Sequence, residues 1–464
     1  MRTIPHVVTE IREAGNLSNL RSVSIGGNDA VIPFKGHYPF LDTDVYKVLE
    51  GLAYELARTD HPSPDFTSFW EEAVSLIQSA QRPDGYLNSY FQSPQIGREP
   101  WSDLAWGHEL YSLGHLIQAG LAADRQLADD RLLTVAIAFA DLAVSKFGPD
   151  GTETVCGHPE VEMALVELYR HTGRADYLEL ARLFIERRGH RTIADDRMPA
   201  EYFQDAVPLR DLDSITGHAV RMMYLAAGAT DVAIETADQD LFDSLERLWR
   251  DMVRHKMYIT GGLGSRHSDE AIGDRFELPS DRSYAETCAA IATMQWAWRM
   301  FLATGEAHYL DAYEQILYNA YAAGISADGT AFFYDNPLQR RPDHRQRSGA
   351  ETDGEELRRA WFSCPCCPPN VARWTAELQD HIAVLGDHLT IAVLTGCRIQ
   401  AGGLDLEIDT EYPWQPRATI RVHRADPDAL GLRLRVPGWC EGSHGLRGGQ
   451  SAAPRSQFGL VRGR

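Results

Sequence analysis

Apolar residues recur at steps of three and four positions from about Val45 to Asp387, and short Gly, Asp or Pro segments separate the runs. This period is typical of amphipathic helices, which bury one face and expose the other. No run of about 18 uninterrupted apolar residues occurs, so the pattern predicts no membrane-spanning helix. The predicted helices cover residues 45–57, 66–81, 104–123, 132–147, 161–170, 177–188, 215–227, 238–255, 284–304, 307–323 and 370–384.

One phrase occurs twice at the junction of two predicted helices. Thr172-Gly-Arg-Ala-Asp-Tyr-Leu and Thr304-Gly-Glu-Ala-His-Tyr-Leu each end one helix at a glycine and begin the next. Helical hairpins that cannot bury their apolar faces alone must stack on neighbouring hairpins. We therefore predict a closed ring of hairpins, an (α/α) toroid, for residues 1–385, with an open solenoid as the alternative. The polar, glycine-rich loops at 84–88 and 260–267 are where we expect a pocket.

Strand-like alternation replaces the helical period beyond Asp387. Residues 388–394, 418–423 and 432–437 alternate apolar and polar positions between turn residues, which predicts a β-sandwich domain over residues 386–441. Residues 442–464 contain four arginines, no acidic residue and no apolar period. We expect this tail to be disordered or aberrant, and the sandwich to be incomplete.

The composition favours a soluble globular protein that binds a neutral small molecule. The chain is 44% hydrophobic and 24% charged, as in soluble globular proteins. Its net charge of −21 repels nucleic acids and anionic membrane surfaces and favours a neutral small-molecule partner. The first residues lack the apolar core of a secretory signal, which favours the cytoplasm. The chain could also form a homodimer.

Seven cysteines, clustered late in the chain, favour metal binding or catalysis over disulfides. The segment Cys364-Pro-Cys366-Cys367-Pro-Pro contains three thiols in four positions, and Glu286 and Cys288 form a second short motif. Glu286, Cys288, Cys366 and Cys367 can supply the soft tetrahedral ligand set that zinc accepts.

Simpler interpretations of these residues stay open. Free cysteines are often small buried apolar residues, and Ser283 and Glu286 have the spacing of a capping box at a helix start. A zinc ion could also have a purely structural role, holding the last helix against the rest of the toroid.

A zinc site with four protein ligands has no open position for an activated water. A metal-bound cysteine, in contrast, is deprotonated and is a nucleophile at neutral pH. A thiolate that attacks an acetal carbon needs an acid to protonate the leaving oxygen. Glu270 is our candidate, with Asp269 as its alternative, although a loop carboxylate is more often solvated surface.

Histidines follow glycine in several helical phrases, at His108, His158 and His218, and His115 shares a predicted helix face with His108. They could bind sugar hydroxyls at the mouth of a toroid, although each alone is more often a core or capping residue. Aromatic residues such as Tyr86, Trp106 and Tyr334 could pack against a sugar.

The two cysteine motifs together resemble glycoside hydrolase family 127, the β-L-arabinofuranosidases. Supporting phrases are Asp42-Thr-Asp-Val-Tyr-Lys, Asp84-Gly-Tyr-Leu-Asn, His108-Glu-Leu-Tyr, Gly261-Gly-Leu-Gly-Ser and Phe333-Tyr-Asp-Asn-Pro. The resemblance runs from about Gly36 to Cys440. It implies an (α/α)6 barrel followed by β-sandwich modules and a retaining hydrolysis through a thioglycosyl intermediate.

By position, the resemblance implies a role for each site residue. Cys366 corresponds to the nucleophile and Glu270 to the acid/base. The implied zinc (Zn²⁺) ligands are Glu286, Cys288, Cys366 and Cys367, and the implied substrate contacts are His108, His158, His218, Tyr334 and Glu314.

The chain also departs from the family pattern, because it ends before the sandwich region of the family does and lacks an N-terminal strand segment. Our hypothesis is removal of a terminal β-L-arabinofuranosyl residue from a carbohydrate. The alternatives are a zinc-containing toroid, a hydrolase or lyase, that acts on another sugar, and a truncated, non-catalytic scaffold.

Overall fold

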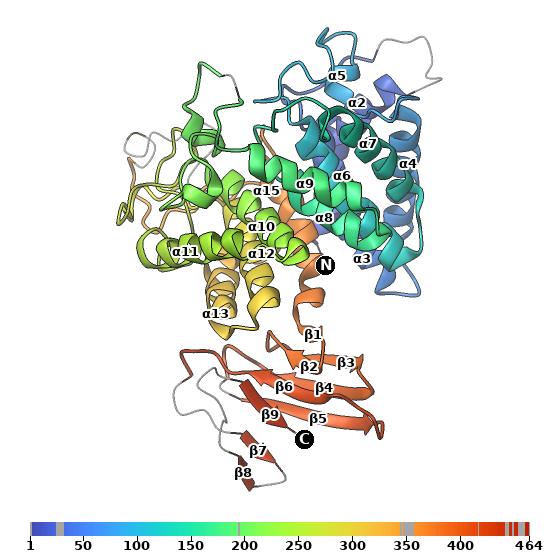
Figure 1. Ribbon diagram of the computed structural model, residues 1–464. Coiled ribbons are helices and arrows are strands. Elements are labelled where there is room, and N and C mark those ends of the chain that lie inside the picture. Colours follow the sequence, from blue (N-terminus) through green and yellow to red (C-terminus); the bar gives the residue numbers. More distant parts are fainter. Residues whose placement is uncertain are drawn as a thin grey trace. The chain divides into compact units, whose positions relative to one another are not determined.

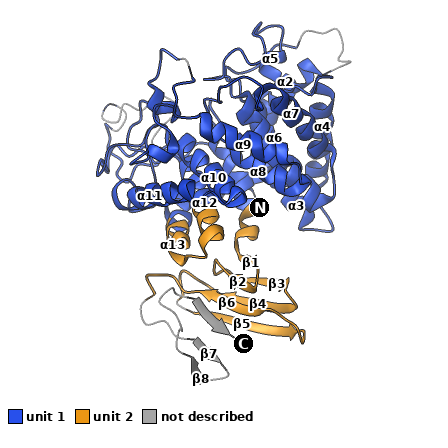
Figure 2. Cartoon of the chain, viewed as in Figure 1, with its two compact units in different colours: residues 1–296, 316–376 blue, residues 297–315, 377–464 orange. Residues whose placement is uncertain are grey.

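Helical hairpins form most of the structure, as the apolar period predicts. The computed structural model describes residues 2–24, 32–193, 195–343, 346, 357–415 and 417–440, and only the backbone of residues 445–447, 450–452 and 460–463. The chain divides into unit 1, residues 1–296 and 316–376, and unit 2, residues 297–315 and 377–464 (Figure 2).

The helices of Figure 1 have the following bounds. They are α1 (Thr3–Ala14), α2 (Asn16–Val23), α3 (Asp42–Ala57), α4 (Pro64–Ala80), α5 (Ser89–Gln92), α6 (Glu109–Leu127), α7 (Arg131–Phe147), α8 (Val161–Thr172), α9 (Ala175–Arg187), α10 (Ala219–Thr236), α11 (Gln239–His255), α12 (Thr287–Thr304), α13 (Ala307–Gln315) and α15 (Cys367–Glu377). Short helical turns are η1 (Ala200–Phe203), η2 (Leu209–Asp211), the π-helical η3 (Ile316–Tyr321) and η4 (Leu378–His381).

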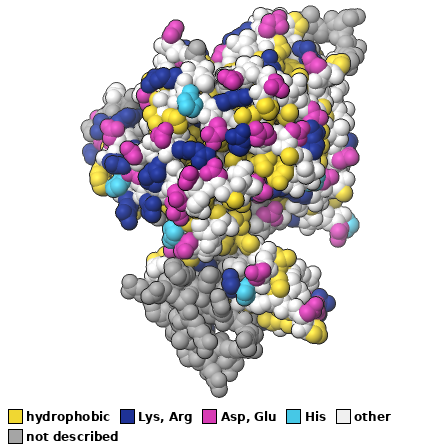
Figure 3. All heavy atoms as spheres, viewed as in Figure 1, with side chains coloured by type: hydrophobic (Ala, Val, Ile, Leu, Met, Phe, Trp, Pro, Cys, Tyr) yellow, Lys and Arg dark blue, Asp and Glu magenta, His cyan; other side chains and the backbone are white. Residues whose placement is uncertain are grey.

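Successive helices of unit 1 alternate between an inner and an outer ring. Most residues of α3, α6, α8 and α10 are buried all round, whereas α4, α7, α9 and α11 bury one face only. The inner helices pack side by side in the order α3, α6, α8 and α10, and each of the last three also packs on the outer helix that follows it. Charged side chains cover the outward face of unit 1 (Figure 3), as the one-sided period requires.

The inner ring closes through α12 and α15. The Trp296 indole of α12 donates to the Thr230 hydroxyl of α10 at 3.1 Å. At the other end, the backbone of Arg373 in α15 lies so close to Gly51 of α3 that a Cβ at position 51 would be 3.2 Å from the Arg373 Cα atom. Six inner helices therefore form a closed (α/α)6 toroid, which confirms the ring and excludes the open solenoid.

Helix boundaries differ from the predictions where histidines precede a helix. The apolar period predicts a start at residue 104, but α6 begins after His108, whose φ of 56° lies in the left-handed region. Similarly, α10 begins after His218, an extended residue whose side chain accepts from the Arg221 backbone N–H. The helices α1 and α2 were not predicted. No helix among the described residues has both the length and the hydropathy needed to cross a bilayer.

Unit 2 contains three small sheets: the pair β7-β8 and two larger sheets that share an apolar core. Its strands are β1 (Ala383–Leu385), β2 (His388–Ile391), β3 (Cys397–Ala401), β4 (Leu404–Thr410), β5 (Ala418–Ala425), β6 (Gly431–Arg435), β7 (Gly445–Arg447), β8 (Gln450–Ala452) and β9 (Leu460–Gly463). One sheet has the order β1-β2-β6-β9, with β2 parallel to β6, and the other is the antiparallel sheet β3-β4-β5. Leu389 and Ile391 of the first sheet share a core with Leu404, Leu406 and Ile408 of the second.

The predicted strands at 388–394, 418–423 and 432–437 correspond to β2, β5 and β6. Much of the predicted tail, residues 442–464, lies outside the described residues, which include only the backbone of β7, β8 and β9 there. Its predicted disorder, and the domain limits at 385 and 441, stay predictions.

Candidate functional site

A cavity of about 350 Å³ opens at one end of the inner ring of unit 1. Each inner helix contributes a lining residue just before its start: Phe40 before α3, His108 before α6, His158 before α8, His218 before α10, Glu286 before α12 and Cys366 before α15. The N-terminal ends of helices carry partial positive charge, which stabilises thiolates and carboxylates. The toroid therefore offers an end suited to anionic groups.

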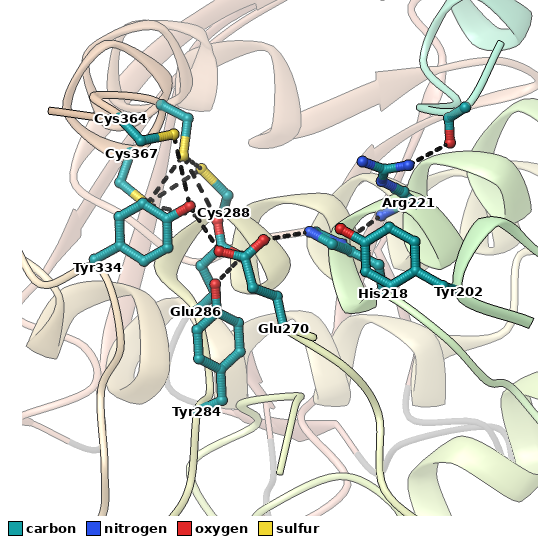
Figure 4. Close-up of polar contacts among 12 residues, drawn as sticks. Tyr202, His218, Arg221, Glu270, Tyr284, Glu286, Cys288, Tyr334, Cys364 and Cys367 are labelled. Atoms are coloured by element: carbon teal, nitrogen blue, oxygen red, sulfur yellow. Dashed lines mark hydrogen bonds and ion pairs between the residues drawn. The ribbon is translucent and has the colours of Figure 1, made fainter. Parts of the chain in front are cut away.

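The four predicted zinc ligands come together at the edge of this cavity, which Glu286 and Cys366 line (Figure 4). The Sγ atom of Cys288 lies 3.4 Å from that of Cys367 and 3.9 Å from that of Cys366, and the last two are 3.8 Å apart. The Glu286 Oε1 atom is 3.8 Å from Cys366 Sγ and 3.7 Å from Cys367 Sγ. Ligands of a tetrahedral zinc ion, with bonds of about 2.0–2.3 Å, are separated by roughly 3.5–3.8 Å. The four atoms therefore fit such an ion.

The protonation of this cluster also indicates a missing positive charge. Hydrogen bonds from Cys288, Cys364 and Cys367 hold the pKa of the Cys366 thiol well below its usual value. Burial raises the pKa of Cys288 and Cys367. Among the described residues, no lysine or arginine forms an ion pair with Glu286, whose pKa burial and the nearby Cys366 raise. All four groups can be anionic together only beside a cation.

The Glu286 side chain faces the thiols, not the backbone at the start of α12. Its Oε2 atom accepts a hydrogen bond from the Tyr284 hydroxyl at 2.8 Å, and no contact between the Ser283 hydroxyl and Glu286 occurs among the described residues. The capping-box alternative therefore has no support in the contacts of these two side chains.

Glu270 lies on the loop that leads from unit 1's glycine-rich segment toward α12, in a left-handed conformation with φ of 51°. The Nε2 atom of His218 is 2.6 Å from its Oε2 atom, and the Tyr334 hydroxyl donates to its Oε1 atom at 3.0 Å (Figure 4). A third of the Glu270 side chain remains exposed. Burial opposes ionisation, but the hydrogen bond from His218 outweighs it and lowers the pKa of Glu270.

Three histidines share one wall of the cavity. The ring of His158 lies 5.4 Å from that of His108 and 5.8 Å from that of His218. The Nδ1 atoms of His108 and His158 face the backbone oxygens of Trp106 and Pro159 at 2.6 and 2.8 Å. Because a carbonyl only accepts, each Nδ1 atom carries the proton and each Nε2 atom is an acceptor.

Burial favours the neutral form of each of these imidazoles. Burial, followed by the nearby Arg221 guanidinium, lowers the pKa of His108 to about 3 and that of His158 well below its usual value. Burial also lowers the pKa of His218. Neutral imidazoles can accept hydrogen bonds from uncharged hydroxyl groups, as a sugar presents.

The sequence assigned no role to two residues of this cavity, Arg221 and Cys364, although Cys364 belongs to the cysteine motif. Arg221 lies under the aromatic rings of Trp106 and Tyr202, 5.3 and 4.6 Å from their centroids, and donates to the Gly157 carbonyl at 2.8 Å. Its position three residues after His218, on the first turn of α10, was the only signal. Cys364 also lines the cavity, 3.9 Å from the Tyr334 hydroxyl.

Glu314 and Tyr86 do not join this site. Glu314 belongs to unit 2, where its Oε1 atom pairs with Arg435 at 2.8 Å and its Oε2 atom accepts from the Tyr412 hydroxyl at 2.8 Å. Tyr86 is buried against Glu109. Neither lines the cavity, so the structure gives no support for a substrate contact by Glu314, and its carboxylate already neutralises a buried arginine.

Comparisons with known proteins agree with this geometry. A model of the family 127 β-L-arabinofuranosidase catalytic domain matches residues 5–380, and a model of the middle domain of the same family matches residues 390–458. A non-reducing end β-L-arabinofuranosidase of Bifidobacterium longum subsp. longum is 34% identical over 454 residues, covering 91% of this chain and 68% of that protein.

Solved structures give the same relationship. A family 127 β-L-arabinofuranosidase of Geobacillus stearothermophilus T6 superposes with a TM-score of 0.91 at 32% identity, over 99% of this chain and 77% of that one. A second family 127 β-arabinofuranosidase superposes with a TM-score of 0.87 at 32% identity, over 99% of this chain and 74% of that one.

Proposed function

Since the chain belongs to glycoside hydrolase family 127 and is a glycoside hydrolase, we propose that it removes terminal β-L-arabinofuranosyl residues from a carbohydrate. The observation that carries the proposal is one small cavity that contains both the thiol of Cys366 and the carboxylate of Glu270. A nucleophile and a proton donor in one pocket are what a retaining hydrolase needs. The activity named for the Bifidobacterium relative supports the choice of sugar.

Zinc is the metal that the proposed ligands favour. The proposed ligands, Glu286, Cys288, Cys366 and Cys367, lie at tetrahedral separations. Their three thiols are soft donors that select zinc over magnesium or calcium. When bound, the ion would keep these thiols deprotonated at neutral pH. Cys366 would then be ready to act as a thiolate.

In the proposed first step, the Cys366 sulfur attacks the anomeric carbon while Glu270 donates its proton to the leaving glycosidic oxygen. The Nε2 atoms of His108 and His158 accept hydrogen bonds from the sugar hydroxyls and orient the ring. In the second step, Glu270 takes a proton from water, which attacks the anomeric carbon and releases Cys366.

The hydrogen bonds to Glu270 favour the second of its two proposed roles, that of the base. They lower its pKa, so the resting carboxylate is ionised at neutral pH, which is the form that activates water. The first step needs the protonated form, and we therefore expect kcat/KM to rise on the acidic side of neutrality. Replacing His218 by asparagine should shift this rise to higher pH, because a hydrogen bond that lowers the pKa of Glu270 is lost.

The test is release of nitrophenol from an aryl β-L-arabinofuranoside by the purified, reduced protein. The α-anomer and a thiol-alkylated sample are the controls. Turnover of the β-anomer alone, lost on alkylation, supports the proposal. Turnover that survives alkylation would point to a toroid enzyme without a cysteine nucleophile, and no turnover by a folded, zinc-loaded sample would point to another sugar or a scaffold.

A cytoplasmic location and a homodimer stay predictions. Cell fractionation tests the first, and sedimentation of the purified protein tests the second.

A further inference from the structure

A second cavity, of about 570 Å³, adjoins the first in unit 1. It is lined by Ser265, Arg266, Phe276, Glu277, Pro279 and Arg282, and it shares His267 and Ser268 with the first cavity. The shared residues lie two and three positions before Glu270. The second cavity therefore meets the first at the loop that carries the proposed acid/base.

Phe276 is the unusual residue of this second cavity. Its side chain is 71% exposed, and its φ of 64° lies in the left-handed region, which L-residues with bulky side chains rarely adopt. The backbone is held there by a hydrogen bond from the Phe276 N–H to the His255 carbonyl at 2.8 Å. The left-handed backbone costs free energy, and a ring that is mostly exposed contributes little to the core. Contact with a ligand therefore explains this residue better than a role in stability.

The charge of Arg266 in this cavity is already balanced. The Arg266 guanidinium binds Glu277 through two hydrogen bonds, of 3.0 and 2.6 Å, and lies 3.0 Å from Asp274. A compensated arginine does not require an anionic ligand, but it presents polar groups at fixed positions. Planar polar groups beside an exposed ring suit a neutral sugar, which offers hydroxyls at its edge and an apolar face of C–H groups.

The proposed reaction indicates which of the two sugars of the substrate would bind in this second cavity. A general acid protonates the oxygen that joins the two sugars, so the departing sugar must lie beside the carboxylate and outside the pocket that holds the cleaved residue. We propose that the cavity around Phe276 is the binding site for the leaving sugar, with the Phe276 ring against its apolar face. This inference rests on the proposed function, because it needs Glu270 to be the acid.

Phe276→Gly and Phe276→Asn test the proposal. Both residues accept a left-handed φ, so neither variant strains the fold, and thermal melts check this. The matched control is Ile259→Ala, which shortens an apolar side chain that is 82% exposed in unit 1 and does not line either cavity. The substrates are methyl β-L-arabinofuranoside and a disaccharide in which a β-L-arabinofuranosyl residue is linked to a second pentose.

We expect the ratio of kcat/KM for the disaccharide to that for the methyl glycoside to fall about tenfold in both Phe276 variants, as loss of one packed aromatic ring implies. The ratio should stay at the wild-type value in the Ile259 variant. An unchanged ratio in folded Phe276 variants overturns the inference while the proposed function stands. A wild-type protein that cleaves neither substrate overturns both.

Discussion

Two buried groups of acidic side chains in this protein compensate their charge in different ways. In unit 2, Arg435 lies between Glu314, at 2.8 Å, and Asp311, at 2.6 Å, so the carboxylates have a cation of the protein beside them. In unit 1, Glu286 lies among three thiols and forms no ion pair with a lysine or arginine among the described residues.

The difference supports the proposal that the group in unit 1 is reactive, whereas the group in unit 2 stabilises the fold. A buried anion needs a cation, a proton or a set of hydrogen-bond donors, because its transfer from water is otherwise costly. The group around Arg435 is complete within the chain. The cysteine group is complete only when its members keep their protons or when a metal binds, and such an incomplete group can react.

The largest expected effect is that of Cys366→Ser. If this thiol is the nucleophile, kcat should fall by at least about 10³-fold, because a serine hydroxyl in its place stays protonated. Release of nitrophenol from the aryl glycoside measures the loss, and circular dichroism checks the fold. The control is Cys440→Ser, a half-buried cysteine of unit 2, which should keep full activity. An active Cys366 variant would remove the proposed nucleophile.

Loss of metal is expected in Cys367→Ser. We expect about one zinc ion per chain in the wild-type protein and much less in this variant, because one of three thiolate ligands is lost. Elemental analysis after gel filtration measures the zinc content, and a chelator should lower the melting temperature of the wild-type protein alone. Cys397→Ser, in unit 2, is the matched control. Equal zinc content in the wild-type and Cys367 proteins would show that the ligands are misassigned.

Removing the cation from the acidic group of unit 2 should lower the stability of the protein. Arg435→Met leaves Glu314 and Asp311 without their cation, and we expect a loss of roughly 3–5 kcal/mol in the free energy of unfolding. Urea denaturation followed by circular dichroism measures it. Arg421→Met, which removes an exposed pair with Asp409 at 3.1 Å, should cost less than about 1 kcal/mol. A similar small loss for both variants would contradict the comparison.

Glu314→Gln separates the two roles considered for this residue. If Glu314 is structural, the variant should unfold at lower urea concentration with KM for the aryl glycoside unchanged. A raised KM with unaltered stability would restore the role as a substrate contact that the family resemblance implied.

The smallest effect concerns a buried carboxyl that keeps its proton. Burial raises the pKa of Glu109 to about 7, although Tyr86 and the Trp101 backbone N–H donate to its Oε1 atom. Between its ordinary pKa of about 4.5 and this value, the folded chain binds more protons than the unfolded chain. The stability that Glu109 contributes is therefore full below about pH 4.5 and is lost as the pH rises through 7.

Melting temperatures at pH 5 and pH 7.5 test this sign. The decrease on going to pH 7.5 should be smaller in Glu109→Gln than in the wild-type protein, because glutamine does not titrate. Glu99→Gln, at an exposed position, should keep the wild-type decrease. An identical decrease in the Glu109 variant would show that this carboxyl does not titrate in the expected range.

Much of the fold followed from the sequence because the helical period and the glycine turns are local signals. The apolar period predicted hairpins from α3 to α15, and two cysteine motifs predicted one cluster although 78 positions separate Cys288 from Cys366. The apolar period did not predict where α6 and α10 begin. The left-handed His108 and the extended His218 come just before these helices and line the cavity, and a pattern of apolar residues does not detect such backbone conformations.

The sequence by itself determined which side chains could react, since thiols, carboxylates and imidazoles have their chemistry wherever they lie. Only the tertiary structure decided which of them meet. Closure of the inner ring brings the N-terminal ends of six helices to one cavity, so that Glu270, Cys366 and three histidines become neighbours. Folding also placed Glu314 in an ion pair with Arg435. The partner of a buried charge depends on packing between segments far apart in the chain, which the sequence does not show.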